Sequence, residues 1–184
     1  YPRYPGDSAA PFMQAICETL ADLGHSVAVI APADPAAPAV QDNGKVRVQR
    51  FSYAPLRRWQ IMGHGRALEN DMRLRPLAYF LLPSFLISAF LALWRLTGEQ
   101  KSQVIHAHWV LPNGLPAAWV ARLRKIPLVI SLHGSDVYLA SRRRPFQSIA
   151  RQIFRQAALV TACSPELRER ALQLGAPANT LLLP

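Results

Sequence analysis

The chain has 184 residues, 51% of them hydrophobic, with no long low-complexity tract and no internal repeat, so it is long enough for one domain with a sizeable core. Its two cysteines, Cys17 and Cys163, lie far apart without metal-ligand spacing, which excludes a disulfide scaffold and fits two buried thiols in a reducing compartment. The formal net charge of +10 fits a surface that attracts phosphates on lipids, sugar nucleotides or nucleic acid, although a generic basic surface would carry the same charge.

The first predicted element is a helix over 9–23. Its apolar residues recur at helical spacing, at Phe12, Ile16, Leu20 and Leu23. Asp7 or Ser8 can cap the first turn, and Gly24 follows the helix at a position that favours a left-handed residue.

Two strands are predicted after this helix. Residues 26–31 (SVAVIA) form a continuous apolar run, which predicts a strand buried on both faces. Residues 45–51 (KVRVQRF) alternate between apolar and polar, which predicts an edge or half-buried strand. No strand precedes the first helix, where a doubly wound domain normally has its central strand, so we expect that strand to lie upstream of Tyr1.

An uncharged segment extends from Leu77 to Trp94. Its 18 residues are near the lower limit of about 17 for crossing a bilayer. A crossing would separate strands that the alternating pattern places in one sheet, so we expect a helix buried in the domain or laid into a membrane interface. Contact with an anionic leaflet is favoured by nearby basic and aromatic residues, namely Arg57, Arg58, Arg66, Arg73, Arg75, Trp59 and Tyr79.

Strands and helices alternate over the second half of the chain. Strands are predicted at 103–108, 127–132 and 158–163, and helices at 115–125, at 145–157 and from Pro165, capped by Ser164, to Gly175. This alternation predicts a Rossmann-like α/β fold, with a parallel sheet and helices on both faces. A sheet of this kind binds ligands at the carboxyl ends of its strands.

Positive charge is concentrated in the same half. Asp136 is the only acidic residue between Glu99 and Glu166. The basic residues of this span are Lys101, Arg122, Arg124, Lys125, Arg142, Arg143, Arg144, Arg151 and Arg155. We expect such a surface to attract anionic groups, above all phosphates.

Candidate functional residues gather where this topology places a ligand crevice. The first group is the loop 4–8 (YPGDS), where small residues let the backbone approach a ligand and the following helix offers amides to an anion. The loop is neither a GxGxxG dinucleotide fingerprint nor a phosphate-binding loop that ends in Gly-Lys-Ser. An ordinary turn into a helix would have the same composition.

The second group follows the first strand of the second half. His106 and His108 fall on one face of that strand because side chains alternate, and Trp109 and a turn at 111–114 (LPNG) come next. Metal binding by the two histidines would need a carboxylate, which only Asp136 could supply nearby. In the alternative, one histidine is packed and the other lines the crevice.

The third group is the segment 132–137 (LHGSDV). An apolar strand places His133 at its carboxyl end, Gly134 begins a tight turn, and Ser135 and Asp136 follow. Asp136 could cap the next segment, and His133 could be a core histidine whose hydrogen bonds are satisfied. The position of His133 at the end of a strand favours a functional role.

Together these segments resemble family 4 of the retaining nucleotide-sugar glycosyltransferases, which have the two-domain GT-B fold. The resemblance covers nearly the whole chain, through YPGDSAAPFMQAICETLADLGHSVAVIAP, VIHAHWVLPNG, PLVISLHGSDV and ALVTACSPELRERALQLGA in this order. Its more specific parts are the HGSDV loop and the segment with Leu20, Gly24, His25 and Val27. Members often have two adjacent glycines in the first loop, where this chain has Gly6 followed by Asp7.

The resemblance implies a role for each group. Gly6 and Asp7 would contact the donor near its diphosphate, and His133 would be the catalytic residue beside the transferred sugar. The acceptor side would be formed by His108, Trp109, Gly114, Ser135 and Asp136. Residues 1–184 would then be a single truncated N-terminal, acceptor-side domain, inactive alone, without its C-terminal donor-binding domain.

The resemblance also implies a reaction. A sugar would move from a UDP-, GDP- or ADP-sugar to a glycan or lipid-linked acceptor with retention of the anomeric configuration. Neither a metal nor another cofactor is expected, because helix dipoles and basic side chains can stabilise the leaving diphosphate. We expect a cytoplasmic enzyme in peripheral contact with the inner face of the cytoplasmic membrane.

Two other functions fit part of the sequence. The net charge would suit a nucleic-acid-binding module, although aromatic residues are not interleaved with the basic ones and no recognition motif is present. A metal hydrolase could use His106, His108, His133 and Asp136, but a further ligand and a general base are not evident.

Overall fold

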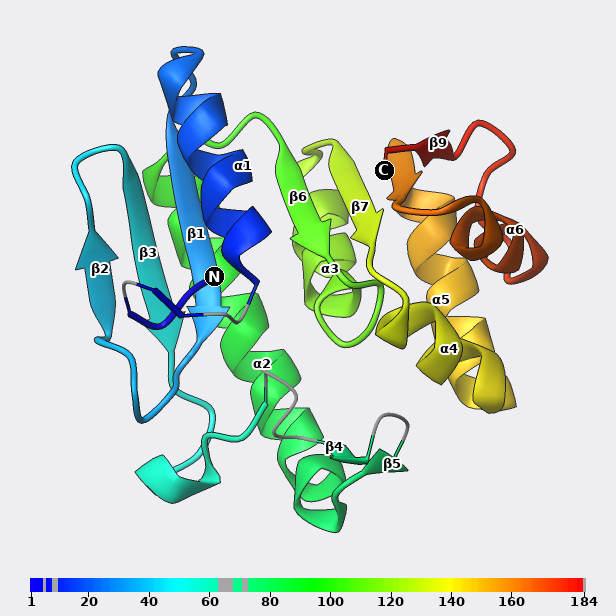
Figure 1. Cartoon of the computed structure of the whole chain (residues 1–184), viewed down its shortest axis with the longest axis horizontal. Coiled ribbons are helices and arrows are strands. Elements are labelled where there is room, and N and C mark those ends of the chain that lie inside the picture. The colour runs from blue at the N-terminus through cyan, green and yellow to red at the C-terminus, as the bar shows by residue number, and fades with distance from the viewer. Residues whose placement is uncertain (5, 8–9, 63–67, 71–72, 184) are drawn as a thin grey trace. The chain divides into compact units, whose positions relative to one another are not determined.

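Figure 1 shows the computed structural model, which describes residues 1–4, 6–7, 10–62, 68–70 and 73–183. The chain divides into two compact units, Tyr1–Ala92 and Leu93–Pro184, and one long helix, α2 (Pro76–Glu99), contributes residues to both. The single sheet expected from the alternating pattern is not formed among the described residues. The reason is that β1 (Val27–Pro32) and β6 (Ile105–His108) are each paired along one edge only, in separate sheets.

Unit 1 contains a three-stranded sheet and a small hairpin. Its elements before α2 are α1 (Pro11–Asp22), β1, β2 (Val40–Asp42), β3 (Val46–Phe51), the 3₁₀ helix η1 (Arg57–Trp59), β4 (Leu68–Asn70) and β5 (Arg73–Leu74). β3 lies between β1, which runs parallel to it, and β2, which runs antiparallel to it. β4 and β5 pair antiparallel as the hairpin. The sequence predicted neither β2 nor this hairpin.

The burial of β1 and β3 agrees only in part with the sequence pattern. β3 alternates, with Val46 and Val48 buried and Arg47 exposed, so the half-buried strand is confirmed, although β3 is central in its sheet. β1 was expected to be buried on both faces, but Ala31 is its one buried residue and the others are half-buried. The prediction was wrong because β1 forms the outer strand of the described sheet.

The helix α1 forms where its spacing predicted a helix, but it buries a different face. Its buried residues are Met13 and Cys17, which pack against Val46 and Val48 of β3 in one hydrophobic cluster. Three residues of the predicted apolar stripe are exposed instead, namely Phe12, Ile16 and Leu23.

The two ends of α1 give one wrong prediction and one confirmed prediction. The N-cap is Ala10, which is left-handed with φ 52° and makes no side-chain cap hydrogen bond, so Asp7 is not the cap. Ser8 lies outside the described residues. Gly24 follows the helix with φ 89°, as the sequence predicted.

The helix α2 confirms the prediction of a helix in the uncharged segment. On one face, Ala78, Leu81 and Phe85 pack with Tyr53 and Met62 in a second hydrophobic cluster of unit 1. By length and composition alone, α2 could also cross a membrane, since an 18-residue window has a mean hydropathy of 2.0 and is only 22% buried. The packed face nevertheless makes one side of this helix part of the protein core.

Unit 2 is an α/β unit with a parallel four-stranded sheet. After α2 come β6, α3 (Gly114–Arg124), β7 (Leu128–Leu132), α4 (Ser135–Arg142), α5 (Arg144–Gln156), β8 (Leu159–Ala162), α6 (Pro165–Gln173) and β9 (Leu181–Leu182). The strand order is β6-β7-β8-β9, and every neighbouring pair is parallel. α3 packs on β6 and β7, and α6 packs on β8 and β9. The predicted Rossmann-like α/β arrangement is therefore confirmed in this unit.

The core of unit 2 is formed by the apolar runs that the sequence assigned to strands and helices. Among its fully buried side chains are Leu128, Ile130, Leu132, Ile153, Phe154 and Val160. The predicted cap of α6 is present, since Ser164 Oγ accepts a hydrogen bond from the backbone N–H of Leu167 at 3.2 Å. Cys163 lies between β8 and α6 and is exposed, so the expectation of two buried thiols is correct only for Cys17.

Candidate active site

The neighbouring parallel strands β6 and β7 of unit 2 (Figure 1) bring His108 and His133 together. β6 ends at His108 and β7 ends at Leu132, so His133 is the first residue beyond its strand. In the register of the two strands, His108 pairs with Ser131, and the N–H of Trp109 donates to the Ser131 carbonyl at 2.9 Å. Because parallel strands end at the same edge of a sheet, two histidines far apart in sequence come into contact.

The imidazole rings of His108 and His133 share a direct hydrogen bond. Nδ1 of His108 lies 2.9 Å from Nε2 of His133, and the ring centroids are 5.1 Å apart. One nitrogen must carry the proton while the other accepts it, so the two rings must hold complementary tautomers. The sequence placed both residues at the crevice but did not predict this bond.

His106 lies beside this pair and begins a second chain of hydrogen bonds. Its ring centroid is 4.3 Å from that of His108, which confirms that the two side chains share one face of β6. Nε2 of His106 is 2.7 Å from Ser131 Oγ, which is 2.8 Å from Thr161 Oγ1. Sequence reasoning missed Ser131 and Thr161. The only sequence feature that could have pointed to them is that each places a hydroxyl group inside an otherwise apolar strand.

The environment of the histidines favours their neutral forms. Burial, reinforced by the charges that His106 and His133 would carry, lowers the pKa of His108 to about 3. Burial also lowers the pKa of His133, and His106 contributes to this shift. At neutral pH these rings therefore act as hydrogen-bond partners and not as cations. His133 is only partly buried, so a ligand can approach it.

Trp109 turns the chain so that its ring lies on His133. Its backbone is left-handed, with φ 68°, a conformation that costs about 1–3 kcal/mol for a residue with a side chain. Its ring centroid is 4.7 Å from that of His133. The turn is closed by Asn113, whose Nδ2 donates to the His108 carbonyl at 3.0 Å, and by Gly114, whose N–H donates to the Trp109 carbonyl at 3.2 Å.

Asp136 is buried between the loops that follow β6 and β7, with 2% of its surface exposed. Its Oδ2 accepts the backbone N–H of Val110 at 2.7 Å, and its Oδ1 accepts the backbone N–H of His133 at 3.2 Å. Burial raises the pKa of this carboxyl group, and the backbone hydrogen bonds oppose the rise. Asp136 therefore ties the two loops together, while the acceptor contact that the resemblance implies stays a prediction.

Gly134 and Ser135 connect His133 to α4. Gly134 is the N-cap and has φ 103° and ψ −66°, a combination that residues with a side chain rarely adopt. Ser135 is exposed as the first residue of the helix. The tight turn predicted at Gly134 is thus confirmed, and Ser135 is accessible to a ligand.

Gly114 is explained by packing at the start of α3. It is buried, and a Cβ atom at this position would lie 3.2 Å from Cγ2 of Ile153 and 3.6 Å from Cδ1 of Ile130. The small residue therefore lets α3 approach α5 and β7 closely. Its predicted acceptor contact stays untested.

Gly6 and Asp7 belong to unit 1, and the donor contact that the resemblance implies for them stays a prediction. Gly6 is exposed, with φ 80°. Asp7 is 5% exposed. Its carboxylate accepts two hydrogen bonds from Arg3, one from Nε at 2.7 Å and one from Nη2 at 2.8 Å. Pro5, Ser8 and Ala9, which flank the pair, lie outside the described residues.

The geometry does not favour the metal-hydrolase alternative. Nδ1 of His108 and Nε2 of His133 are bonded to each other, and both oxygens of Asp136 accept backbone N–H groups. Within the described part of the chain, no group of three or more His, Cys, Asp or Glu residues could hold a metal ion.

Comparison with known families decides what kind of domain this site belongs to. Residues 9–184 match the family described as the glycosyl transferase 4-like domain. The chain belongs to this family. It therefore carries a glycosyltransferase domain, which confirms the resemblance drawn from the sequence motifs.

The chain spans only part of the length of two proteins that it resembles. Over 73 residues, the chain is 40% identical to the putative teichuronic acid biosynthesis glycosyltransferase TuaC of Bacillus subtilis (strain 168), a match that covers 39% of this chain and 18% of that protein. A solved structure described as the S. aureus MnaA-UDP co-structure matches with a TM-score of 0.46 and 13% identity, over 84% of this chain and 42% of the other. The matched region spans less than half of each of these two proteins.

Proposed function

We propose that the protein transfers a sugar from a nucleotide-sugar donor to an acceptor, and that the chain described above supplies the acceptor side. The observation that carries this proposal is the position of His133, which lies partly exposed just beyond the end of β7 in a glycosyltransferase family domain. The donor would be a UDP-, GDP- or ADP-sugar, as the resemblance implies. The acceptor would be a glycan or lipid-linked polysaccharide precursor, which the name of the Bacillus subtilis relative supports.

His133 would be the residue that contacts the transferred sugar. Its orientation is set by its backbone bond to Asp136 and by its ring bond to His108. Since burial lowers its pKa, it would act as a neutral hydrogen-bond partner of sugar hydroxyl groups. A partner fixed before the substrate binds stabilises the transition state without the cost of reorganising.

The acceptor would lie against the loops after β6 and β7. Trp109 offers an aromatic surface beside His133, and apolar faces of sugar rings pack on such surfaces. Ser135 is exposed at the start of α4 and would offer a hydroxyl group to the acceptor. His108 would act mainly by orienting His133, since its own ring is hydrogen-bonded to it.

The donor would be held chiefly by a second domain, with Gly6 and Asp7 near its diphosphate. This arrangement predicts that residues 1–184 alone show no turnover. It also predicts a product with the anomeric configuration of the donor, formed without a metal. Helix N-termini and basic side chains can stabilise the leaving diphosphate.

The test uses the intact protein with UDP-, GDP- and ADP-sugars, extracted glycolipid or polysaccharide precursor as acceptor, and release of nucleoside diphosphate as the readout. We expect turnover with one class of donor. His133→Ala should lower kcat by about 100-fold or more, the range typical of positioned catalytic groups. Proton NMR of the product would report whether the configuration is retained.

The matched control is His25→Ala, which removes an exposed imidazole next to the amino end of β1. This variant should keep wild-type rates. If His133→Ala also kept them, His133 would not be the catalytic residue. If no donor gave turnover with the intact protein, or if turnover were lost on adding EDTA, the proposed reaction or its metal independence would be wrong.

A further inference from the structure

One face of α2 presents large apolar side chains to solvent. Phe80, Ile87 and Leu91 are 75%, 59% and 58% exposed, and Trp94 follows on the same face with 37%. Their spacing of seven, four and three residues places them on one side of a helix. The opposite face of the helix packs into the core of unit 1. An exposed apolar surface of this kind marks a site that contacts a membrane or another molecule.

In unit 2, a second helix, α3, also exposes apolar side chains. Trp119 and Leu123 lie one turn apart on α3 and are 42% and 62% exposed. The last turns of α2 and the end of α3 are joined by Arg124, whose guanidinium lies 3.9 Å from the centroid of the Trp94 ring. Nη2 of the same arginine donates to the Trp94 carbonyl at 2.7 Å.

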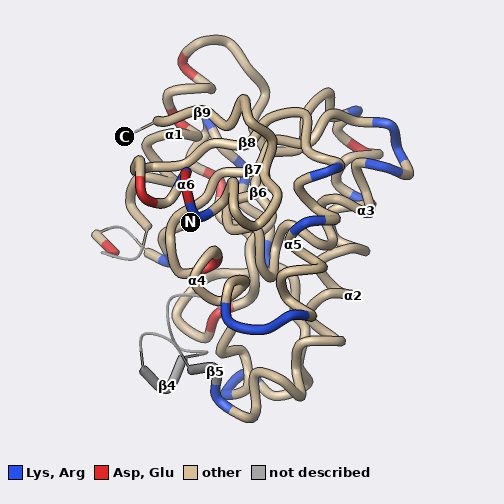
Figure 2. Tube along the Cα trace, turned by 90° about the vertical axis from the view of Figure 1, so that its right-hand side faces the viewer, with Lys and Arg blue, Asp and Glu red and all other residues tan. Residues whose placement is uncertain are grey.

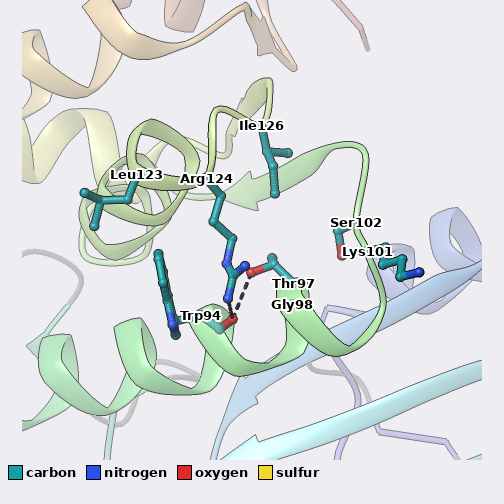
Figure 3. A pocket seen from close by; sticks show the side chains of 8 residues that line it. All are labelled: Trp94, Thr97, Gly98, Lys101, Ser102, Leu123, Arg124 and Ile126. Atoms are coloured by element: carbon teal, nitrogen blue, oxygen red, sulfur yellow. Dashed lines mark hydrogen bonds between the residues drawn. The ribbon is translucent and has the colours of Figure 1, made fainter.

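Figure 3 shows the open hollow of about 410 Å³ that these two helices form, with Arg124 reaching from α3 to Trp94. Leu123 and Lys101 also line it. Gly98 makes the contact possible, since a Cβ atom there would lie 2.7 Å from Nη2 of Arg124. Apolar and cationic side chains therefore line the same hollow, and the contacts of Arg124 with Trp94 hold α2 and α3 together there.

The charged residues around this surface are almost all positive. Between residues 93 and 126, Glu99 is the only acid, and it is paired with Arg95 at 2.6 Å. The cations of this stretch are Arg95, Lys101, Arg122, Arg124 and Lys125. Arg122 and Arg124 lie in the last turn of α3, and Figure 2 shows blue segments near this helix. Near the other end of α2, in unit 1, Arg57 and Arg58 are exposed on η1, whose Trp59 packs against the cluster that holds Phe85.

We propose that the outer face of α2, with Phe80, Ile87, Leu91 and Trp94, binds the surface of an anionic lipid bilayer, and that the exposed apolar side chains of α3, Trp119 and Leu123, contact the same kind of surface. The apolar side chains enter the interface, and the surrounding cations meet the phosphate groups of the lipids. Aromatic and aliphatic residues on one helix face with flanking Arg and Lys are the signature of interfacial helices. This inference does not depend on the proposed sugar transfer.

The structure favours contact with the surface of a bilayer over three alternatives, namely a helix that crosses the bilayer, a symmetric dimer and nucleic acid. A helix that crossed the bilayer would have to expose Ala78, Leu81 and Phe85, which are packed in the core of unit 1. A symmetric dimer through this face would bring the same cations of two copies together, and like charges repel. Nucleic acid would engage the cations but would leave the aliphatic side chains of Ile87 and Leu91 without a role.

The experiment measures sedimentation of the intact protein with vesicles of phosphatidylcholine, with and without about 30% phosphatidylglycerol. We expect binding to the anionic vesicles, weak binding to the neutral ones, and partial loss of binding at high salt. The double variant Ile87→Ser/Leu91→Ser should weaken binding by at least about tenfold, because it removes buried hydrocarbon from the interface. Arg122→Ala/Lys125→Ala should weaken binding to the anionic vesicles alone.

Two controls match these variants. Leu23→Ser removes an exposed leucine from the end of α1, and Arg47→Ala removes an exposed arginine from β3, so neither should change binding. Thermal unfolding followed by circular dichroism would show that every variant is folded. Quenching of tryptophan fluorescence by brominated phosphatidylglycerol should fall in Trp94→Phe/Trp119→Phe, which reports the inserted surface directly.

Three results would overturn the proposal. The first is that the wild-type protein binds neutral and anionic vesicles with equal affinity, or binds neither kind of vesicle. The second is a dimer in solution that Ile87→Ser/Leu91→Ser dissociates, which would assign the face to a second copy. The third is binding of duplex DNA that removes the protein from anionic vesicles and is unaffected by Ile87→Ser/Leu91→Ser.

Discussion

Nδ1 of His108 lies 2.9 Å from Nε2 of His133, so the two imidazoles form one hydrogen-bonded unit at the carboxyl ends of β6 and β7. Burial lowers the pKa of His108 to about 3, so this ring is neutral at physiological pH. The tautomer of either ring is therefore fixed by the other. It follows that the hydrogen bonding of His133 toward a substrate depends on a residue that belongs to a different strand.

Replacing His108 should impair the chemical step more than substrate binding. His108→Phe keeps an aromatic ring but removes the nitrogen that faces His133, so the orientation of His133 is lost. We expect kcat of the intact protein to fall about 10- to 100-fold with a small change in KM, the scale that misplacement of a reacting group produces. His108→Asn retains a polar atom near the position of Nδ1 and should restore part of the rate. A rate in His108→Phe equal to that of His25→Phe would show that the ring bond has no functional role.

Stability should fall as the pH falls, through His108. Its pKa is about 6.5 in the unfolded chain and about 3 in the folded chain, so the unfolded state binds more protons between these values. The contribution is fully present above about pH 6.5 and decreases as the pH falls toward 3. Urea unfolding should show that the free energy of unfolding falls between pH 7.5 and pH 5, and that it falls by about 1–2 kcal/mol more in the wild type than in His108→Phe.

The comparison of those two proteins isolates the histidine. Asp136, whose pKa is raised, favours folding as the pH falls, but it is present in both. Equal losses of stability in the wild type and in His108→Phe would contradict the assignment of a neutral, half-buried His108.

Replacing the buried carboxylate of Asp136 should destabilise the fold. Asp136→Asn keeps the shape of the side chain but offers one acceptor oxygen to two backbone N–H groups, those of Val110 and His133. One buried donor loses its partner, which costs about 1–3 kcal/mol. Chemical denaturation should show this loss, whereas Asp22→Asn, which alters an exposed ion pair with Lys45, should change stability by about 0.5 kcal/mol or less. A difference of zero between the two variants would mean that Asp136 does not hold the two loops.

The parts of the fold that follow from local pattern could be predicted from the sequence. The apolar runs around Ile130 and Val160 and the helices between them gave a parallel sheet, and alternation placed His106 and His108 on one face. The carboxyl-edge position of His133 followed from the same pattern. Each of these features depends on residues close together in the chain.

Features that depend on packing between distant segments were not predictable. Two adjacent stripes of α1, one with Phe12 and Ile16 and one with Met13 and Cys17, have the same spacing, and only the sheet decides which is buried. The bond between His108 and His133 requires the pairing of β6 with β7, which no local pattern specifies. The role of Asp136 as a link between two loops was hidden for the same reason.

The turn at Gly134 should tolerate no side chain. With φ 103° and ψ −66°, its backbone lies where a Cβ atom is strained, although the nearest atom to such a Cβ, Cε2 of Tyr138, is 3.9 Å away. Gly134→Ala should therefore cost about 1–3 kcal/mol through the backbone alone, measured by urea unfolding. Because the turn follows His133 directly, the same variant should lower the rate of sugar transfer. Ser135→Ala, one residue further at an exposed helical position, should leave stability within about 0.5 kcal/mol of the wild type. If both variants were equally stable, the backbone at Gly134 would not require a glycine.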